Sequence, residues 1–245
     1  MERNIIEIFS SIQGEGKYAG CRQVFVRFEG CNLNCRYCDT ENQPGTHRSC
    51  QVEAGAGSRR FEAWDNPLSS DQVSRIIERM LLEVPHQAVS FTGGEPLLHA
   101  AFIHDLAQRI RKQTKVFLET NGSLPEALER ILEDVDIISM DIKMPGITGK
   151  DLWEQHRSFM DIGKEKELYV KMVISDETQE DEFHHAVKLM AGVVPQAMCI
   201  LQPVTPCGGC KAASPQKVLQ YQAYALRYLS DVRVIPQTHK MIGQM

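Results

Sequence analysis

The sequence lacks the features that mark a membrane, fibrous or disordered protein. No apolar run is long enough to span a bilayer, and Val135–Met140, one of the longest, is interrupted within a few residues. Hydrophobic residues make up 42% and charged residues 24% of the 245 residues, a balance that excludes disordered and collagen-like chains. The chain contains no internal repeat and no low-complexity tract. We therefore expect a single globular domain over residues 1–245.

An excess of positive charge is also missing. The 27 Lys and Arg residues are outnumbered by 32 Asp and Glu residues, which gives a net charge of -5. This composition provides no basic footprint for nucleic acid. The N-terminal residues Met1–Asn4 contain no signal-peptide core or cleavage site. The sequence therefore predicts a cytoplasmic protein that binds neither nucleic acid nor a membrane.

Cysteine is sparse, and its distribution matters more than its number. Eight cysteines in 245 residues are too few for a disulfide framework, and in a cytoplasmic protein they stay reduced. Clustered thiols then indicate metal or redox chemistry. The sequence holds one group of three, one close pair and three scattered cysteines, namely Cys31, Cys35 and Cys38; Cys207 and Cys210; and Cys21, Cys50 and Cys199.

Short β-rich segments alternate with amphipathic helical patterns along most of the chain. This rhythm predicts a parallel sheet covered by helices, which closes into a full or partial barrel or stays open. The predicted strands are Gln23–Phe28, Ala88–Thr92, Lys115–Glu119, Val135–Met140, Leu168–Ile174, Cys199–Pro203 and Val232–Ile235. The predicted helices are Asp71–Leu82, Ala101–Lys112, Pro125–Leu132, Thr178–Met190 and Pro215–Tyr228.

One segment, Glu41–Pro67, interrupts this rhythm. It is rich in Gly, Ser, Pro, Asn and charged residues and shows no sustained period. We interpret it as a long insertion loop within the single domain, of the kind that is often functional or mobile.

Three cysteines occupy one loop directly after the first predicted strand, in the order Cys31-Asn-Leu-Asn-Cys35-Arg-Tyr-Cys38. A cubane cluster has four irons, so three cysteines leave one iron without a protein ligand. An open position on a metal is where chemistry usually occurs. The alternative is a zinc ion that takes Cys50 or Cys21 as its fourth ligand. The gaps of three and two residues differ from the paired two-residue gaps of common zinc sites, and favour the cluster.

The pattern Cys-x3-Cys-x2-Cys resembles the signature of radical S-adenosylmethionine (SAM) enzymes. Phe91-Thr-Gly-Gly-Glu-Pro96 follows the next predicted strand and is similar to the glycine-rich SAM-binding turn of that superfamily. Two glycines allow the backbone to approach a ligand closely. The resemblance implies a [4Fe–4S] cluster, SAM as cofactor, and an α/β fold built as a partial or modified (β/α)6 TIM-like barrel.

Two further features indicate a substrate. Gln13-Gly-Glu-Gly16 follows a short apolar strand, and its amide and carboxylate can read the donor and acceptor edge of a heterocycle, although a capped loop is the plainer interpretation. Strand alternation places Val24, Val26 and Phe28 on one face and Arg27 on the other. A guanidinium facing the centre of the sheet requires an anion. The candidates are a substrate carboxylate and Glu29.

These features together resemble the 7-carboxy-7-deazaguanine synthase (QueE) family. The shared motifs lie along nearly the whole chain outside the insertion: Gln-Gly-Glu-Gly, Phe-Val-Arg, the cysteine loop, Thr-Gly-Gly-Glu-Pro, Glu119–Gly122, Leu201–Pro203 and Pro236–Lys240. The resemblance implies a radical ring contraction of 6-carboxy-5,6,7,8-tetrahydropterin to 7-carboxy-7-deazaguanine with loss of ammonia, in queuosine and 7-deazapurine biosynthesis. In this family SAM is regenerated.

The resemblance also implies a role for particular residues. Arg27 would bind the pterin carboxylate, and Met245 would supply a terminal carboxylate, although the chain ends in methionine where relatives can end in proline. The other implied substrate contacts are Ile12, Gln13, Gly14, Glu15, Thr92 and His239. The implied SAM contacts are Gly94, Ser139, Met140, Asp141, Gln202 and Pro203. The implied metal ligands are Cys31, Cys35 and Cys38 for the cluster and Thr40 for Mg²⁺, which prefers oxygen ligands.

The family resemblance further implies a homodimer and an electron donor such as flavodoxin or ferredoxin. Two other functions stay open at this point: another radical SAM enzyme, such as a glycyl-radical activase, and a zinc-stabilised binding module without activity. Cys207-Gly-Gly-Cys210 has the spacing of a redox pair or of half a metal site, which Cys50 could join.

Overall fold

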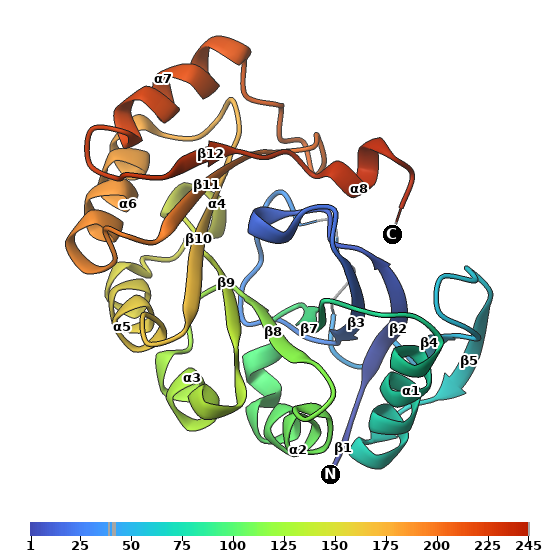
Figure 1. Ribbon diagram of the computed structural model, residues 1–245. Helices are drawn as coiled ribbons and strands as arrows, with labels where there is room; N and C mark the ends of the chain where they lie inside the picture. Colours follow the sequence, from blue (N-terminus) through green and yellow to red (C-terminus); the bar gives the residue numbers. More distant parts are fainter. Residues whose placement is uncertain (39, 41–42, 245) are drawn as a thin grey trace.

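Parallel strands form most of a ten-stranded sheet in the computed structural model, which describes residues 1–38, 40 and 43–244 (Figure 1). The strands of this sheet, in spatial order, are β12 (Val232–Val234), β11 (Met198–Pro203), β10 (Glu167–Ile174), β9 (Ile137–Asp141), β8 (Lys115–Thr120), β7 (Ala88–Gly93), β3 (Arg22–Phe28), β2 (Ile5–Ile12), β4 (Ser49–Glu53) and β5 (Phe61–Asp65). All neighbours from β12 to β3 are parallel, whereas β2 is antiparallel to β3. A separate antiparallel pair joins β1 (Glu2–Arg3) to β6 (Leu68–Ser69).

Helices connect the parallel strands and cover the outer face of the curled sheet (Figure 1). The longer helices are α1 (Ser70–Glu83), α2 (Ala100–Ile110), α3 (Pro125–Ile131), α5 (Trp153–Gly163), α6 (Glu180–Val193) and α7 (Pro215–Ala225). The short elements are α4 (Pro145–Thr148), α8 (Thr238–Met241), η1 (Gly16–Tyr18), η2 (Pro96–His99) and η3 (Leu132–Asp134). Within the described residues, no helix has both the length and the apolar character needed to cross a membrane.

Strand alternation separates two apolar layers. Val24, Val26 and Phe28 of β3 are fully buried in the large core between the sheet and the helices, as predicted from the sequence. Phe117 and Tyr169 belong to a smaller cluster formed by residues from the other face of the strands. A parallel sheet with both faces covered in this way is the partial (β/α) barrel that the resemblance implied.

The open side of this partial barrel is covered by the segment that follows β2. There η1 packs against β10 and β11, and the ring of Tyr169 occupies the space next to Gly16, where a Cβ atom would lie 2.4 Å from the Tyr169 hydroxyl. The Lys17 ammonium lies 2.5 Å from Glu167 Oε1. These contacts join the segment after β2 to β10 and β11, which are not neighbours of β2 in the sheet.

The structure corrects the sequence analysis in two places. The segment predicted as an insertion loop contains the antiparallel hairpin of β4 and β5, and β4 adds to the sheet beside β2; its first residues, 41 and 42, lie outside the described part of the chain. Helix α5 was not predicted. Both elements are short or polar, and their stability comes from neighbours that are distant in the sequence.

Candidate active site

A cavity of about 550 Å³ lies where the carboxyl ends of the parallel strands meet the N-terminal and C-terminal segments. Most of the site residues implied by the resemblance line it together: Ile12, Gln13, Gly14, Glu15, Arg27, Cys31, Cys35, Cys38, Thr40, Thr92, Gly94, Asp141, Gln202 and His239. Ligands in parallel α/β folds bind at this end of the strands. The sequence motifs, which lie far apart along the chain, therefore converge on one site.

Three of the implied site residues that the structure describes do not line the cavity. The Met140 side chain is fully buried in the core under the helices, because alternation along β9 turns it away from Asp141. Ser139 lies two residues before Asp141 on β9 and is buried below the cavity. Pro203 is the last residue of β11 and does not line the cavity. Met245 lies outside the described residues.

The three-cysteine loop opens onto this cavity. Cys31 and Cys35 are half-buried and Cys38 is exposed, and burial raises the pKa of the Cys31 and Cys35 thiols. In the described part of the chain the three thiols are not drawn together in ligand geometry, but they share one short loop and one cavity. Of the proposed fourth zinc ligands, Cys50 is fully buried in the core, and neither Cys50 nor Cys21 lines the cavity. This arrangement fits a cluster held by three cysteines.

The glycine turn after β7 packs directly on the backbone of the cysteine loop. Gly93 adopts φ +127°, and a Cβ atom there would lie 2.3 Å from the Phe28 carbonyl oxygen. At Gly94 a Cβ atom would lie 2.0 Å from the Gly30 carbonyl oxygen, and the next amide, of Glu95, donates to that same oxygen at 2.8 Å. Glycine is therefore required here for contact between two backbones, in addition to the close approach to a ligand that the sequence indicated.

The carboxylate of Glu95 ties this turn to the turn after β8. It is fully buried and accepts hydrogen bonds from the Thr120 hydroxyl (2.8 Å), the Leu97 amide (3.0 Å) and the Asn121 amide (2.8 Å). Burial raises the pKa of Glu95 to about 7, although these three donors oppose the shift. Glu95 thus fixes the carboxyl ends of β7 and β8, next to the cysteine loop, relative to each other.

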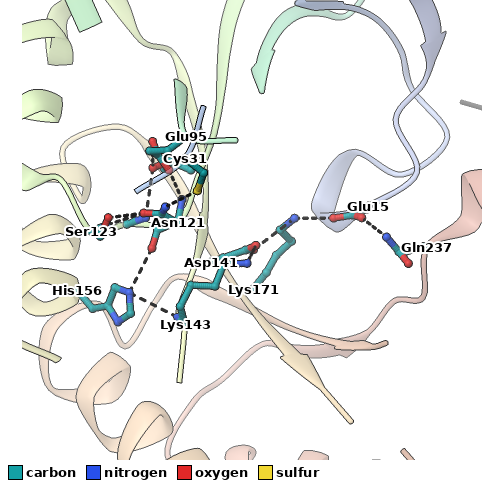
Figure 2. A network of polar contacts seen from close by, with 12 residues as sticks. Glu15, Cys31, Glu95, Asn121, Ser123, Asp141, Lys143, His156, Lys171 and Gln237 are labelled. Atoms are coloured by element: carbon teal, nitrogen blue, oxygen red, sulfur yellow. Dashed lines mark hydrogen bonds and ion pairs between the residues drawn. The ribbon is translucent and has the colours of Figure 1, made fainter. Parts of the chain in front are cut away.

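A buried chain of charges runs across the cavity (Figure 2). The Lys171 ammonium lies 2.6 Å from Glu15 Oε2 and 3.3 Å from Asp141 Oδ1, and the Lys143 ammonium lies 2.7 Å from Asp141 Oδ2. Although burial raises the pKa of Glu15, Lys171 outweighs it and lowers that pKa to about 2. Burial opposes the charge of Lys171, yet Asp141 and Glu15 hold its pKa well above the usual value. Both partners are therefore ionised at neutral pH.

The two ends of the chain meet at this cavity. The Thr238 amide donates to the Gly14 carbonyl oxygen (2.8 Å), and the Gln237 amide group donates to Glu15 Oε1 (2.8 Å). The His239 ring packs so closely on Gly14 that a Cβ atom there would lie 1.9 Å from His239 Nδ1. The N-terminal and C-terminal residues that the resemblance implied as substrate contacts thus form one wall of the cavity.

Arg27 faces the cavity, as the alternation in β3 predicted, but its partner within the protein is Glu7 and not Glu29. Its Nε–H donates to Glu7 Oε1 of the neighbouring strand at 2.6 Å, and both side chains are largely buried. Glu29 is engaged elsewhere, with the Asn4 amide group and the His47 backbone amide. The hydrogen bonds found among the described residues use only the Nε–H of Arg27, so its two Nη groups remain available for an anion in the cavity.

Sequence analysis missed several residues of the site. Lys171, Lys143, Glu119, Asn121 and Tyr37 all line the cavity. For Lys171 a signal existed, because it interrupts the otherwise apolar strand Leu168–Ile174, and a lysine inside such a strand is rarely buried without a partner. Glu119 and Asn121 belong to the Glu119–Gly122 motif and Tyr37 to the cysteine loop, both noted in the sequence without a role for these side chains. Lys143 follows β9 and carries no pattern of its own.

The Cys207–Cys210 turn packs against the cysteine loop, and Cys207 also lines the cavity. The Cys207 thiol donates to the Tyr37 carbonyl oxygen at 3.0 Å, and Cys210 is buried against Val173 and Val204. At Gly208, with φ +55°, a Cβ atom would lie 2.0 Å from the Arg36 carbonyl oxygen.

Substitution of Gly208 with alanine is expected to displace the cysteine loop. The overlap with the Arg36 backbone predicts a loss of about 1–3 kcal/mol in unfolding free energy and poorer retention of iron after anaerobic reconstitution. Gly209 is the matched control, because it also has a positive φ of +80° but no atom within 4 Å of a Cβ. Urea unfolding and iron analysis of both variants test this. Equal effects of Gly208→Ala and Gly209→Ala would show that only backbone strain matters.

Comparison with known proteins gives a consistent result. The family model of the radical SAM superfamily matches residues 25–184. The 7-carboxy-7-deazaguanine synthase of Geobacter sulfurreducens is 44% identical over 243 residues, covering 98% of this chain and 96% of that protein. The synthase of Methanocaldococcus jannaschii is 37% identical, covering 98% and 100%. The crystal structure of QueE from Escherichia coli has the same fold, with a TM-score of 0.64 at 17% identity over 98% of this chain and 95% of that one.

Proposed function

The chain belongs to the radical SAM superfamily and, within it, to the 7-carboxy-7-deazaguanine synthases, and on this premise we propose how its residues divide the work. The enzyme catalyses the radical SAM ring contraction of 6-carboxy-5,6,7,8-tetrahydropterin to 7-carboxy-7-deazaguanine, with loss of ammonia, in 7-deazapurine biosynthesis. The observation that supports the assignment of roles is the single cavity on which the cysteine loop, the glycine turn and both chain ends converge.

Cys31, Cys35 and Cys38 hold the [4Fe–4S] cluster in this proposal. When bound, the cluster and SAM supply the radical that removes a hydrogen atom from the pterin. Gly94, Asp141 and Gln202 contact SAM from the strand ends. The Gln202 side-chain oxygen is buried and accepts no hydrogen bond within the described part of the chain, so it can receive one from a ligand. Ser139, Met140 and Pro203 do not line the cavity, so in this proposal their side chains do not contact SAM and only their backbone can contribute to its binding.

The opposite wall binds the pterin. Gln13 and Glu15 read the edge of the ring, and the His239 ring, held on Gly14, closes the pocket. Ile12, Gly14 and Thr92 complete this wall. Thr40 is half-buried on the cavity wall, and we propose that its hydroxyl binds Mg²⁺ together with substrate oxygens.

Arg27 binds the pterin carboxylate in this proposal. Glu7 holds the guanidinium through its Nε–H, which leaves the Nη fork in the geometry that suits a carboxylate. Since such a charged hydrogen bond contributes about 1.5–3 kcal/mol, Arg27→Ala is expected to lower kcat/KM for the carboxypterin by about 10- to 10²-fold. SAM affinity should not change. Anaerobic turnover and SAM-binding assays measure both.

A matched control for Arg27→Ala is Arg75→Ala. Arg75 lies on α1 with its side chain 76% exposed and pairs with Asp71, so this variant loses the same charge outside the site and should turn over normally. If Arg27→Ala still converts the carboxypterin at the unmodified rate, the substrate assignment is wrong. Another radical SAM reaction, such as glycyl-radical activation of a partner protein, then becomes the better interpretation.

A radical SAM enzyme needs a reductant as well as its small-molecule substrate. We propose that this reductant is a flavodoxin or ferredoxin, that the enzyme is a homodimer, and that it acts in the cytoplasm. We also propose that residues 1–245 form one domain in which the segment from Glu41 to Pro67 is an insertion. The family resemblance supports the reductant and the homodimer, and the composition and periodicity of the sequence support the location and the domain organisation.

A further inference from the structure

The side chain of Asn121 points at a sulfur of the cysteine loop (Figure 2). Asn121 follows β8 directly, and its Nδ2 lies 3.8 Å from Cys31 Sγ and 3.0 Å from Asn32 Oδ1. An amide NH₂ group has two hydrogens, so one can be assigned to each acceptor. The residue is 5% exposed and comes from a strand other than the one that leads into the cysteine loop.

The orientation of this amide is fixed by its surroundings. The Ser123 backbone amide, which can only donate, lies 3.0 Å from Asn121 Oδ1, and the Ser123 hydroxyl donates to the same oxygen at 2.5 Å. These two donors require the oxygen on that side. The nitrogen of Asn121 must therefore face Cys31 and Asn32.

The backbone of Asn121 is held equally firmly. Its amide donates to Glu95 Oε2 at 2.8 Å, and its carbonyl oxygen lies 3.2 Å from His156 Nε2. Glu95 and His156 are both fully buried. With two hydrogen bonds on the side-chain oxygen and two more on the backbone, Asn121 cannot turn away when the charge on the neighbouring sulfur changes. Its Nδ2–H group is therefore preorganised toward Cys31.

The Cys31 sulfur receives a second donor from its own loop. The Leu33 backbone amide lies 3.4 Å from Cys31 Sγ. Backbone donors of this kind come with the loop itself, whereas the Asn121 donor depends on one side chain that another amino acid could replace. The contribution of Asn121 can therefore be measured separately.

We propose that Asn121 is a positioning residue that donates a hydrogen bond to the Cys31 thiolate in the cluster-loaded enzyme and raises the reduction potential of the cluster. Hydrogen bonds to cluster sulfurs stabilise the reduced state, which carries one more negative charge. The proposal rests on the proposed function, because it requires the cluster on Cys31, Cys35 and Cys38. It assigns to Asn121 an effect on electron delivery that is separate from any contact with substrate or SAM.

The test compares Asn121→Ser with Ser123→Ala. A serine at position 121 can still accept from the Ser123 amide and keep the turn, but it is too short to donate to Cys31. Ser123→Ala removes two hydrogen bonds, the one that its hydroxyl donates to Asn121 Oδ1 and the one that it accepts from Asn32 Nδ2 (2.8 Å). The Ser123 backbone amide still holds the Asn121 amide group in place. The full chain is reconstituted anaerobically with iron and sulfide and titrated with dithionite while its electron paramagnetic resonance is recorded.

Asn121→Ser is expected to make reduction of the cluster about tenfold less favourable, a shift of about 59 mV to lower potential for one electron. Ser123→Ala should shift the potential by less than a third of this amount. In electron–nuclear double resonance of the reduced cluster, the Leu33 amide proton should remain coupled in all three proteins. A further exchangeable proton coupling, from Asn121, should be present in the unmodified protein and in Ser123→Ala and absent from Asn121→Ser.

Two outcomes overturn the inference. One is an unchanged potential in Asn121→Ser with the proton coupling retained. The other is an equal shift in Asn121→Ser and Ser123→Ala, which would assign the effect to the turn. In both cases a [4Fe–4S] cluster still forms, so the proposed function survives. If the unmodified protein forms no such cluster, the proposed function itself fails.

Discussion

Replacing Cys35 with serine is expected to abolish both the cluster and turnover. Three thiolates are the minimum that holds a cubane with one open iron. Neither Cys21 nor Cys50 lines the cavity, and the Cys207 thiol, which does line it, donates to the Tyr37 carbonyl oxygen. Since enzymes accelerate such reactions by at least about 10⁶-fold, product formation should fall to background. Iron and sulfide analysis of the anaerobically reconstituted variant, together with a turnover assay, measures this directly.

The control for Cys35→Ser is Cys21→Ser, which removes a half-buried thiol outside the cavity and should keep full iron content and activity. The zinc interpretation makes the opposite prediction. A zinc module would be colourless, would hold one zinc and no sulfide, and would lose its metal on Cys50→Ala or Cys21→Ser. One zinc without sulfide in the purified protein, or loss of the metal in Cys50→Ala or Cys21→Ser, would contradict the cluster assignment.

Replacing Lys171 with methionine is expected to have the next largest effect. Lys171 is the cation shared by Glu15 and Asp141, and removing one partner of a buried ion pair costs about 3–5 kcal/mol of unfolding free energy. The same change releases Glu15 from its place beside the pterin. Because small displacements of positioning groups can cost about 10²-fold in rate, kcat/KM should fall by that order.

The loss in Lys171→Met should depend on pH in a defined direction. In the unmodified protein the pKa of Glu15 is about 2, below its ordinary 4.5, so this ion pair contributes stability above pH 4.5 that is lost as pH falls toward 2. Without Lys171, burial remains and raises the pKa of Glu15. The variant should then lose stability as pH rises above 4.5, so that the difference between the two proteins grows from pH 5 to pH 8.

Urea unfolding at several pH values measures this difference. Lys171→Arg is the matched control, because it keeps the positive charge, although the larger guanidinium must fit the same space; it should recover most of the stability and flatten the pH dependence. A constant difference between Lys171→Met and the unmodified protein from pH 5 to pH 8 would show that Glu15 is not held ionised by Lys171.

The elements predicted from local sequence patterns agree with the structure, because their signals are complete within a few residues. Helix α1 shows this: apolar residues recur along it with helical spacing, and Ser69 caps it through its side chain, which accepts from the Gln72 amide. The hairpin of β4 and β5 carries no such local signal and was not predicted. Its stability depends on β4 pairing with β2, where Glu7 lies opposite Gln51, 44 residues further along the chain. Neither composition nor periodicity within the hairpin indicates this distant partner.

By itself the sequence determined the cysteine loop, the glycine turn and the face on which Arg27 lies. Each of these depends on residues within one loop or one strand, where spacing alone sets which side chains can act together. The tertiary structure decided the partners: Glu7 for Arg27, Lys171 for Glu15 and Asp141, and Asn121 for Cys31. Strand register places Glu7 opposite Arg27 and Asp141 opposite Lys171, whereas Glu15 meets Lys171, and Asn121 meets Cys31, across elements that are not neighbours in the sheet. No periodicity in the chain indicates any of these partners.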